Sequence, residues 1–302
     1  MIHNKQLLIF LFLSVSVQAY PQSLQSIRQH IAQIIHSKNA VVGVAITSAD
    51  GQDTLSINGA KRFPMQSVFK FPIALAMLSE IDKGNFSLDQ KVEIKKSELL
   101  PGIYSPIREA YPEGTTLTIA EILQYTVSLS DNVGCDVLLR LLGEPEAVER
   151  YLKAHNIKDI SIKINEEIMQ SDWESQFRNW TTPVEANRIL QTYYENRGNL
   201  LSPASHRFIW DLMKGTETGR NRLKGRLPEG TVVAHKTGWS GRNEATGITA
   251  AVNDVGVVFM PDGNHFYISV FVTASSEDME TNERIIADIT KAAWDYFMSK
   301  QR

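Results

Sequence analysis

Three short strings of polar residues follow one another along the chain and together could support nucleophilic catalysis. They are Ser67-Val68-Phe69-Lys70, Ser130-Asp131-Asn132 and Lys236-Thr237-Gly238. A serine followed three residues later by a lysine is expected roughly once by chance in a chain of this length, and a given tripeptide on the order of 0.05 times. The first string alone is therefore weak evidence, whereas all three in this order are strong evidence for a catalytic site.

The first string could supply a nucleophile and the base that activates it. The pattern predicts a helix that begins near Ser67, and Lys70 then lies one turn later on the same face. An amine in a low-dielectric, cation-rich cleft has a lowered pKa, so it can take the proton of a serine hydroxyl. Had this string stood alone, a helix-capping serine with a solvated lysine would be the better interpretation.

The other two strings offer groups for a leaving nitrogen and for substrate recognition. Ser130 and Asn132 fall between two predicted helices, where a hydroxyl can carry a proton and an amide can hold a carbonyl. Lys236 and Thr237 lie on a predicted strand edge, where a cation and a hydroxyl suit a carboxylate-bearing substrate. Helix capping and a solvated strand end are the simpler alternatives. Alternation along the strand turns His235 away from the face of Lys236, so we expect a structural histidine.

Strand patterns at both ends of the chain, with helical patterns between them, predict the frame that positions these strings. Apolar residues at helical spacing predict helices over residues 24–38, 69–83, 119–129, 132–142, 144–154, 183–194, 203–213 and 277–298. Alternating or β-branched segments predict strands over residues 40–47, 53–57, 231–237, 246–253, 256–260 and 265–274. The two ends should meet in one sheet, giving an α/β lobe from residues 20–62 and 216–302 and an all-α lobe from residues 63–215.

Composition and charge narrow the class of protein. The chain has 302 residues, 43% of them hydrophobic, which is typical of a globular protein. Its net charge of −3 provides no overall positive field, so we expect no binding to nucleic acid or anionic lipid. The single cysteine, Cys135, excludes an intrachain disulfide and a zinc site of several thiolates, and we interpret it as a core residue.

The N-terminal residues have the pattern of a secretory signal peptide. Lys5 precedes an apolar run of eleven residues, Leu7 to Val17, and Val17-Gln18-Ala19 matches a cleavage site. As a helix this run rises only ~16 Å, too little for a bilayer core of roughly 30 Å, although an uncleaved anchor is the alternative. Removing 19 residues with one lysine and no acid leaves 283 residues and a net charge of −4. We expect a monomer in the periplasm or outside the cell, with no membrane segment.

The three strings, in this order and at these separations, resemble the set shared by class A serine β-lactamases and penicillin-binding proteins. The likeness covers essentially the whole chain after the leader, and further strings are similar to the PER/VEB branch of extended-spectrum class A enzymes. These strings are Pro64-Met65-Gln66, Gly134-Cys135-Asp136, Asn165-Glu166-Glu167, Asn179-Trp180-Thr181, Arg222-Leu223-Lys224-Gly225 and Ala234-His235. The resemblance implies α/β plus all-α architecture: an antiparallel sheet with flanking terminal helices, a helical lobe, and an active site between them.

The resemblance assigns the chemical steps to four residues. Ser67 would be acylated, Lys70 would activate it, and Ser130 would relay a proton to the β-lactam nitrogen. Glu166 lies seventeen residues before Pro183 and fills the place of the family's deacylation base on an omega-shaped loop. Without the resemblance, this glutamate would be interpreted as a solvated loop carboxylate. Whether the glutamate, acting through water, or the lysine is the acylation base is unsettled in the family.

The resemblance also assigns the substrate contacts. Asn132 would hold the side-chain amide of the substrate, and Lys236, Thr237 and Arg222 would bind its carboxylate. The backbone N–H groups of the nucleophile and of Trp239 would form the oxyanion hole, where position matters and not side-chain identity.

Several positions depart from the family pattern. Gln170 stands beside the expected hydrolytic water, where many relatives have asparagine and this branch has histidine. An amide can still contact that water, so we expect turnover to persist, and a stable acyl-enzyme with an ordinary penicillin would contradict this. Ile164 and Asn179 replace a loop-closing ion pair, so other contacts must hold the loop. Asp136 replaces an asparagine, and if it lies near Glu166 either one carboxylate should have a raised pKa or the loop must take another path.

The largest departure is Trp239, directly after Lys-Thr-Gly, where a small or hydroxylated residue is usual. Its indole could narrow the cleft, stack on a substrate side chain, or fold onto the protein surface. We expect Trp239→Thr to change the preference between cephalosporins and penicillins, which parallel changes in kcat/KM for both classes would contradict.

These observations predict an exported enzyme that hydrolyses the β-lactam ring of penicillins and cephalosporins, including oxyimino-cephalosporins, and confers β-lactam resistance. The reaction would pass through an acyl-Ser67 intermediate that is removed by water activated by Glu166. A D-alanyl-D-alanine peptidase or transpeptidase and a non-hydrolytic β-lactam sensor are the alternatives, and the glutamate argues against both. We expect no cofactor and no metal, since neither His-x-His nor His-Glu-x-x-His occurs.

Overall fold

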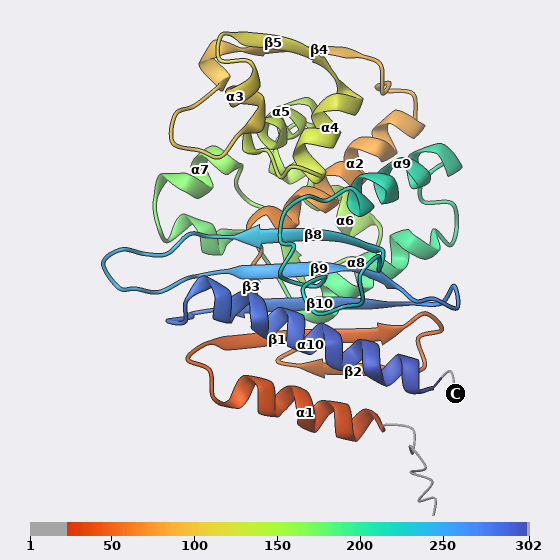
Figure 1. Ribbon diagram of the computed structural model, residues 1–302. Coiled ribbons are helices and arrows are strands. Elements are labelled where there is room, and N and C mark those ends of the chain that lie inside the picture. The colour runs from red at the N-terminus through yellow and green to blue at the C-terminus, as the bar shows by residue number, and fades with distance from the viewer. Residues whose placement is uncertain (1–22, 301–302) are drawn as a thin grey trace, which may run out of the picture.

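A five-stranded antiparallel sheet forms the frame of the protein in the computed structural model, which describes residues 23–300 (Figure 1). The strand order is β2-β1-β10-β9-β8. The strands are β1 (Val41–Ser48), β2 (Thr54–Ile57), β8 (Val233–Trp239), β9 (Val252–Phe259) and β10 (His265–Thr273). Because β1 pairs with β10 along its whole length, the two ends of the chain meet in one sheet, as predicted. The predicted signal peptide, residues 1–19, lies outside the described residues.

Two terminal helices, α1 (Leu24–His36) and α10 (Met279–Ser299), cover one face of this sheet (Figure 1). Side chains alternate along a strand, so every second residue of the sheet faces these helices. Ile31 of α1 and Ile286 of α10 are fully buried in one apolar cluster with Ile268 of β10. Burying a side chain of this size contributes roughly 1.5–3 kcal/mol, so this packing anchors both ends of the described chain.

The opposite face of the sheet packs against the middle of the chain. Phe63 and Phe271 are fully buried there, with ring centroids 5.7 Å apart. Helix α2 (Lys70–Asp82) is buried continuously from Lys70 to Ser79, as expected of a helix that is apolar on all sides. It is therefore the central helix of this region, and its first residue is the lysine of the first polar string.

The other elements of the middle region surround α2 and are mostly helical (Figure 1). The helices are α3 (Pro106–Ala110), α4 (Ile119–Val127), α5 (Asn132–Leu142), α6 (Pro145–Ala154), α7 (Glu166–Ser171), α8 (Pro183–Glu195) and α9 (Pro203–Lys214). Three 3-10 turns are η1 (Gln66–Phe69), η2 (Lys96–Glu98) and η3 (Ser175–Arg178). Two small sheets are formed by β4 (Lys91–Lys95) with β5 (Gly114–Thr118), and by β3 (Phe63–Pro64), β7 (Trp180–Thr181) and β6 (Ile160–Ser161).

The segment before β9 differs from the prediction. Residues 246–253 and 256–260 were expected to form two strands, but one strand begins only at Val252. Before this strand, Asn243 Oδ1 accepts hydrogen bonds from the backbone N–H groups of Ala245 and Thr246. Gly247 has a φ of +69°. These features hold a turn, because the left-handed backbone of Gly247 is incompatible with an extended strand.

The burial of Cys135 and the character of the helices can be compared with the predictions. Cys135 is fully buried in the apolar cluster of the middle region, as expected of a core residue. Within residues 23–300, none of the helices combines the length and the apolar character needed to cross a bilayer. The lobe boundaries at residues 62 and 216 remain a prediction.

Candidate active site

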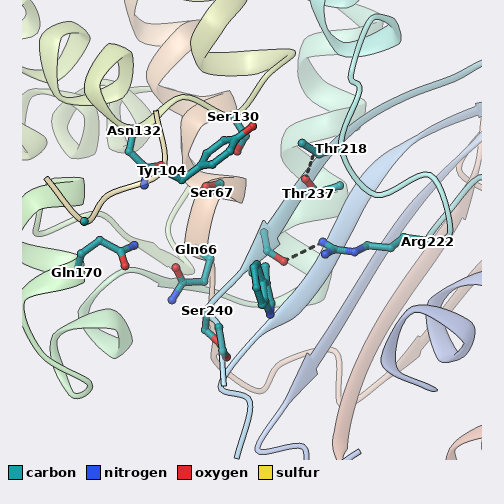
Figure 2. A pocket seen from close by; sticks show the side chains of 14 residues that line it. Gln66, Ser67, Tyr104, Ser130, Asn132, Gln170, Thr218, Arg222, Thr237 and Ser240 are labelled. Atoms are coloured by element: carbon teal, nitrogen blue, oxygen red, sulfur yellow. Dashed lines mark hydrogen bonds between the residues drawn. The ribbon is translucent and has the colours of Figure 1, made fainter. Parts of the chain in front are cut away.

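A cleft of about 440 Å³ lies between β8 and the helical region and brings the predicted site residues together (Figure 2). The predicted residues that line it are Ser67, Ser130, Asn132, Gln170, Arg222, Thr237 and Trp239. The remaining three, Lys70, Glu166 and Lys236, are 0%, 1% and 0% exposed. Lys70 donates a hydrogen bond to Ser67, and Lys236 donates one to Ser130. Glu166 forms an ion pair with Lys70, so all the predicted residues belong to one connected site.

The nucleophile turn η1 differs from the predicted geometry. Ser67 lies in this 3-10 turn, and the α-helix begins only at Lys70. The preceding residue, Gln66, has a φ of +47°, which prevents an α-helix from extending through it. Gly238 of β8 lies against this turn, and a Cβ there would be 2.5 Å from the carbonyl oxygen of Met65. The close approach that Gly238 permits therefore sets the position of the serine against the sheet.

Lys70 connects the nucleophile to a carboxylate. Its Nζ donates hydrogen bonds to Ser67 Oγ (2.7 Å), Asn132 Oδ1 (2.6 Å) and the carbonyl oxygen of Ser130 (3.1 Å). The same atom lies 2.6 Å from Glu166 Oε1. If Lys70 passes a proton to Glu166, its freed amine can accept the proton of Ser67, which is the arrangement that activates a weak nucleophile.

Glu166 is the first residue of α7, and the start of this short helix is fixed by two side chains. Asn165 caps it, accepting a hydrogen bond from Ile168 N at 3.0 Å. Asp136 accepts hydrogen bonds from the backbone N–H groups of Glu166 (2.7 Å) and Glu167 (3.0 Å). Burial and the neighbouring Glu166 carboxylate raise the pKa of Asp136 to about 7. The conditional expectation of a raised carboxylate pKa is thus confirmed.

Ser130 stands between the two lysines of the site. Its φ of +62° is uncommon for a residue with a side chain and costs on the order of 1–3 kcal/mol. The next residue, Asp131, holds this strained turn, since its carboxylate accepts hydrogen bonds from Gly134 N (2.7 Å) and Ile107 N (2.7 Å). Lys236 Nζ donates to Ser130 Oγ at 2.9 Å. Complete burial and the nearby charge of Lys70 lower the pKa of Lys236, which makes proton exchange with the hydroxyl easier.

The far end of the cleft carries a hydroxyl pair and a guanidinium. Thr237 Oγ1 and Thr218 Oγ1 are 2.6 Å apart. Arg222 donates through one terminal nitrogen to the carbonyl oxygens of Gly238 (3.0 Å) and Asn253 (3.1 Å), and through Nε to Glu283 Oε1 (3.2 Å). Figure 2 shows Arg222 and Thr237 on the same side of the cleft. A carboxylate bound there would meet both a cation and hydroxyl donors.

Neutral amides hold the loop that carries Glu166. Asn179 Oδ1 accepts hydrogen bonds from Lys163 N (2.8 Å) and Ile164 N (3.1 Å), and Asn179 Nδ2 donates to the Ile164 carbonyl at 2.8 Å. Gln66 Nε2 donates to Gln176 Oε1 at 2.8 Å, which links the nucleophile turn to η3. The expectation that contacts other than an ion pair hold this loop is thus met by buried amides.

His235 has the structural position that strand alternation predicts. It is fully buried, and its Nδ1 lies 2.9 Å from Asp254 Oδ1. Asp254 also accepts a hydrogen bond from Leu223 N at 3.2 Å, beside Arg222. The pair therefore fixes the segment that presents the guanidinium.

Several residues that line the cleft were not predicted from the sequence. Gln66, Tyr104, Thr218 and Ser240 also line it. Tyr104 is 53% exposed, and an aromatic residue after the turn-forming Pro101-Gly102 was a usable signal. Gln66 directly precedes the nucleophile, but its partner Gln176 is 110 residues away, and no local pattern identifies such a pair.

In this site a serine, a buried lysine and a glutamate are in contact. They lie under a cleft that also contains a second serine and an end suited to a carboxylate. This arrangement defines an acyl-transferring serine hydrolase. The profile of the β-lactamase enzyme family matches residues 26–297. The chain therefore belongs to this family and, within it, to class A, in the branch that includes VEB-1 and PER-1.

Individual relatives show the extent of this similarity. The chain is 52% identical to β-lactamase VEB-1 of Pseudomonas aeruginosa over 97% of its own length and 98% of that protein. It is 40% identical to extended-spectrum β-lactamase PER-1 of the same species, over 95% and 93% of the two lengths. A class A β-lactamase structure from Bacteroides cellulosilyticus has a TM-score of 0.86 and 39% identity, covering 91% of this chain and 98% of that one.

Proposed function

We propose that this enzyme hydrolyses the β-lactam ring of penicillins and cephalosporins, including oxyimino-cephalosporins, and so confers β-lactam resistance. The observation that carries the proposal is the position of Lys70 Nζ, 2.7 Å from Ser67 Oγ and 2.6 Å from Glu166 Oε1. The similarity to an extended-spectrum β-lactamase supports the substrate class.

In the acylation step, Ser67 Oγ attacks the lactam carbonyl while its proton passes to the Lys70–Glu166 pair. The backbone N–H groups of Ser67 and Trp239 stabilise the oxyanion of the tetrahedral intermediate. As that intermediate collapses, the C–N bond breaks and Ser130 Oγ donates its proton to the ring nitrogen. Lys236, 2.9 Å from that hydroxyl, helps to restore the proton.

In the deacylation step, Glu166 takes a proton from a water molecule that attacks the acyl-Ser67 carbonyl. The ester C–O bond breaks, the proton returns to Ser67 Oγ, and the product leaves as a carboxylic acid. Gln170 follows Glu166 by one turn of α7 and lines the cleft, so its amide supplies a hydrogen-bonding group for this water.

Substrate recognition is divided between the two ends of the cleft. Asn132 binds the acylamido group of the substrate, and Lys236, Thr237 and Arg222 bind the ring carboxylate. The guanidinium supports this assignment, because Glu283 and two carbonyl oxygens hold it in place before the substrate arrives.

We further propose that residues 1–19 are a signal peptide and that the enzyme acts as a monomer in the periplasm or outside the cell. The apolar run from Leu7 to Val17 and the cleavage-site pattern Val17-Gln18-Ala19 support the signal peptide.

A chromogenic cephalosporin assay on the wild type and on Glu166→Ala tests the proposed function. The wild type should turn over many equivalents, whereas Glu166→Ala should release about one equivalent of product signal and then stop. One equivalent from the wild type as well would reject hydrolysis and favour a non-hydrolytic sensor or a D-alanyl-D-alanine peptidase. Ser67→Ala, which should give no signal, controls for uncatalysed opening.

A further inference from the structure

Two large aromatic side chains are unusually exposed in the cleft. Among the described residues, Trp239 (54%) and Tyr104 (53%) have the highest exposed fractions of the large hydrophobic side chains, and both line this cleft. Trp239 is also the one exposed residue of β8, where all the preceding residues are buried. Within residues 23–300, no aromatic ring or cation stacks on its indole. The ring therefore presents an open face to a ligand.

The position of Trp239 along β8 indicates which part of a substrate meets this ring. Side chains two residues apart on a strand point to the same face, so Trp239 lies beside Thr237. Thr237 pairs with Thr218 at the end of the cleft that we assign to the ring carboxylate. In a cephalosporin, the carbon next to the one that bears this carboxylate carries the variable 3-substituent. A cephalosporin whose carboxylate binds at Thr237 would therefore direct its 3-substituent toward the side of the cleft where Trp239 lies.

Hydrogen bonds hold the backbone on both sides of Trp239, so the point from which its side chain extends into the cleft is fixed before a ligand binds. Trp239 pairs with Val252 of β9, and the carbonyl of the preceding Gly238 accepts a hydrogen bond from Arg222 at 3.0 Å. The following residue, Ser240, donates its N–H to Ala251 O at 3.1 Å. An aromatic side chain on a fixed backbone loses little conformational entropy on binding, which favours a contribution to affinity.

We propose that Trp239 is a specificity-determining residue that selects cephalosporins with a planar aromatic or heteroaromatic 3-substituent over those with a 3-methyl group. This inference rests on the proposed function, since it uses the same cleft and the same reaction. Stacking on the indole should raise kcat/KM for the planar substrate by about five- to tenfold, mainly through a lower KM.

The test compares two cephalosporins that share one 7-acyl group, the first with a 3-methyl group and the second with a planar 3-arylvinyl group. The ratio of their kcat/KM values is measured for the wild type, Trp239→Thr and Trp239→Phe. Because each enzyme is tested on both substrates, differences in intrinsic reactivity cancel. Tyr111→Ala serves as the matched control, since this tyrosine is 37% exposed and does not line the cleft.

We expect the ratio to fall about five- to tenfold in Trp239→Thr, to be largely retained in Trp239→Phe, and to stay unchanged in Tyr111→Ala. An unchanged ratio in Trp239→Thr, or an equal loss for both substrates, would overturn the inference. If the wild type is acylated without turnover, the hydrolytic function fails. The same ratio, taken from second-order acylation constants, then still decides the role of Trp239.

Discussion

Lys70 shows how one buried residue organises the chemistry of this enzyme. An isolated ammonium in the interior would be costly, but here four oxygen atoms surround it, including a carboxylate at 2.6 Å. Lys236 and Arg222 add two further cations around the cleft. Cations placed at the cleft favour an anionic ligand locally although the chain has a net charge of −3, and Glu166 and Glu283 offset part of this positive charge.

We propose that Glu283 positions Arg222 for substrate binding, because its carboxylate lies 3.2 Å from Arg222 Nε. We expect Glu283→Gln to raise KM about fivefold for a β-lactam with a free carboxylate and to change kcat little. The carboxylate methyl ester should show no such rise. Steady-state kinetics on both substrates provide the measurement.

Glu280→Gln is the matched control, since Glu280 lies one turn earlier on α10, is 80% exposed and pairs with Arg284. An equal rise in KM for the acid and its ester would show that Glu283 does not act through carboxylate recognition.

Among the elements, α7 depends on a carboxylate that is costly to ionise. The pKa of Asp136 is raised to about 7, so its ionisation disfavours the folded state relative to the unfolded chain. Its contribution to stability is therefore complete below pH ~4 and lost as the pH rises through about 7. We expect the unfolding free energy of the wild type to fall relative to that of Asp136→Asn by on the order of 2 kcal/mol between pH 5 and 8. Urea unfolding at a series of pH values gives this difference, and parallel curves would disprove it.

The loop from β6 to β7 depends on the buried amide pair Gln66–Gln176. Removing one amide leaves the other buried without a partner, at a cost of about 1–3 kcal/mol. We therefore expect Gln176→Leu to speed amide hydrogen exchange in residues 160–181 by about tenfold. Gln191→Leu, which removes an amide bound to Glu195 on α8, is the control. Unchanged exchange in this loop would show that the amide pair does not hold it.

An element can be predicted from the sequence when it is long and when the contacts that define it are close together along the chain. Helix α5 begins at Asn132 and ends at Leu142, as predicted, because its apolar spacing and the Asp131 cap are local. The two-residue strands of the second small sheet carry no periodicity that could be recognised. The position of Ser67 in a 3-10 turn depends on Gln66 and Gly238, which meet only in the folded protein.

For the whole molecule, one sheet separates two apolar clusters, and β8 is the edge strand of this sheet next to the cleft. Phe271 faces the helical region and packs on Phe63, whereas its neighbour Val272 faces the terminal helices. Both helical layers therefore pack against the sheet that contains β8. The sequence predicts this arrangement from strands at both ends of the chain, but the register that aligns Thr237 with Arg222 comes from tertiary contacts.

We expect Phe271→Ala to lower the unfolding free energy by about 3–5 kcal/mol, since it opens a cavity in the fully buried interface. Denaturant unfolding followed by fluorescence measures the loss. Phe177→Ala, at a residue that is 40% exposed, should cost less than about 1 kcal/mol. Equal losses in the two variants would contradict the assignment of this core.

The proposed mechanism requires that a β-lactam forms an ester with Ser67 and that Glu166 directs the hydrolysis of this ester. Intact-protein mass spectrometry of Glu166→Gln mixed with an ordinary penicillin tests it most directly, with Ser67→Ala as the control. We predict a lasting mass increase equal to one substrate in Glu166→Gln, none in Ser67→Ala, and a rapid return of the wild type to its unmodified mass. A wild type that stays fully acylated, or a Glu166→Gln variant that clears its adduct as fast as the wild type, would contradict the account.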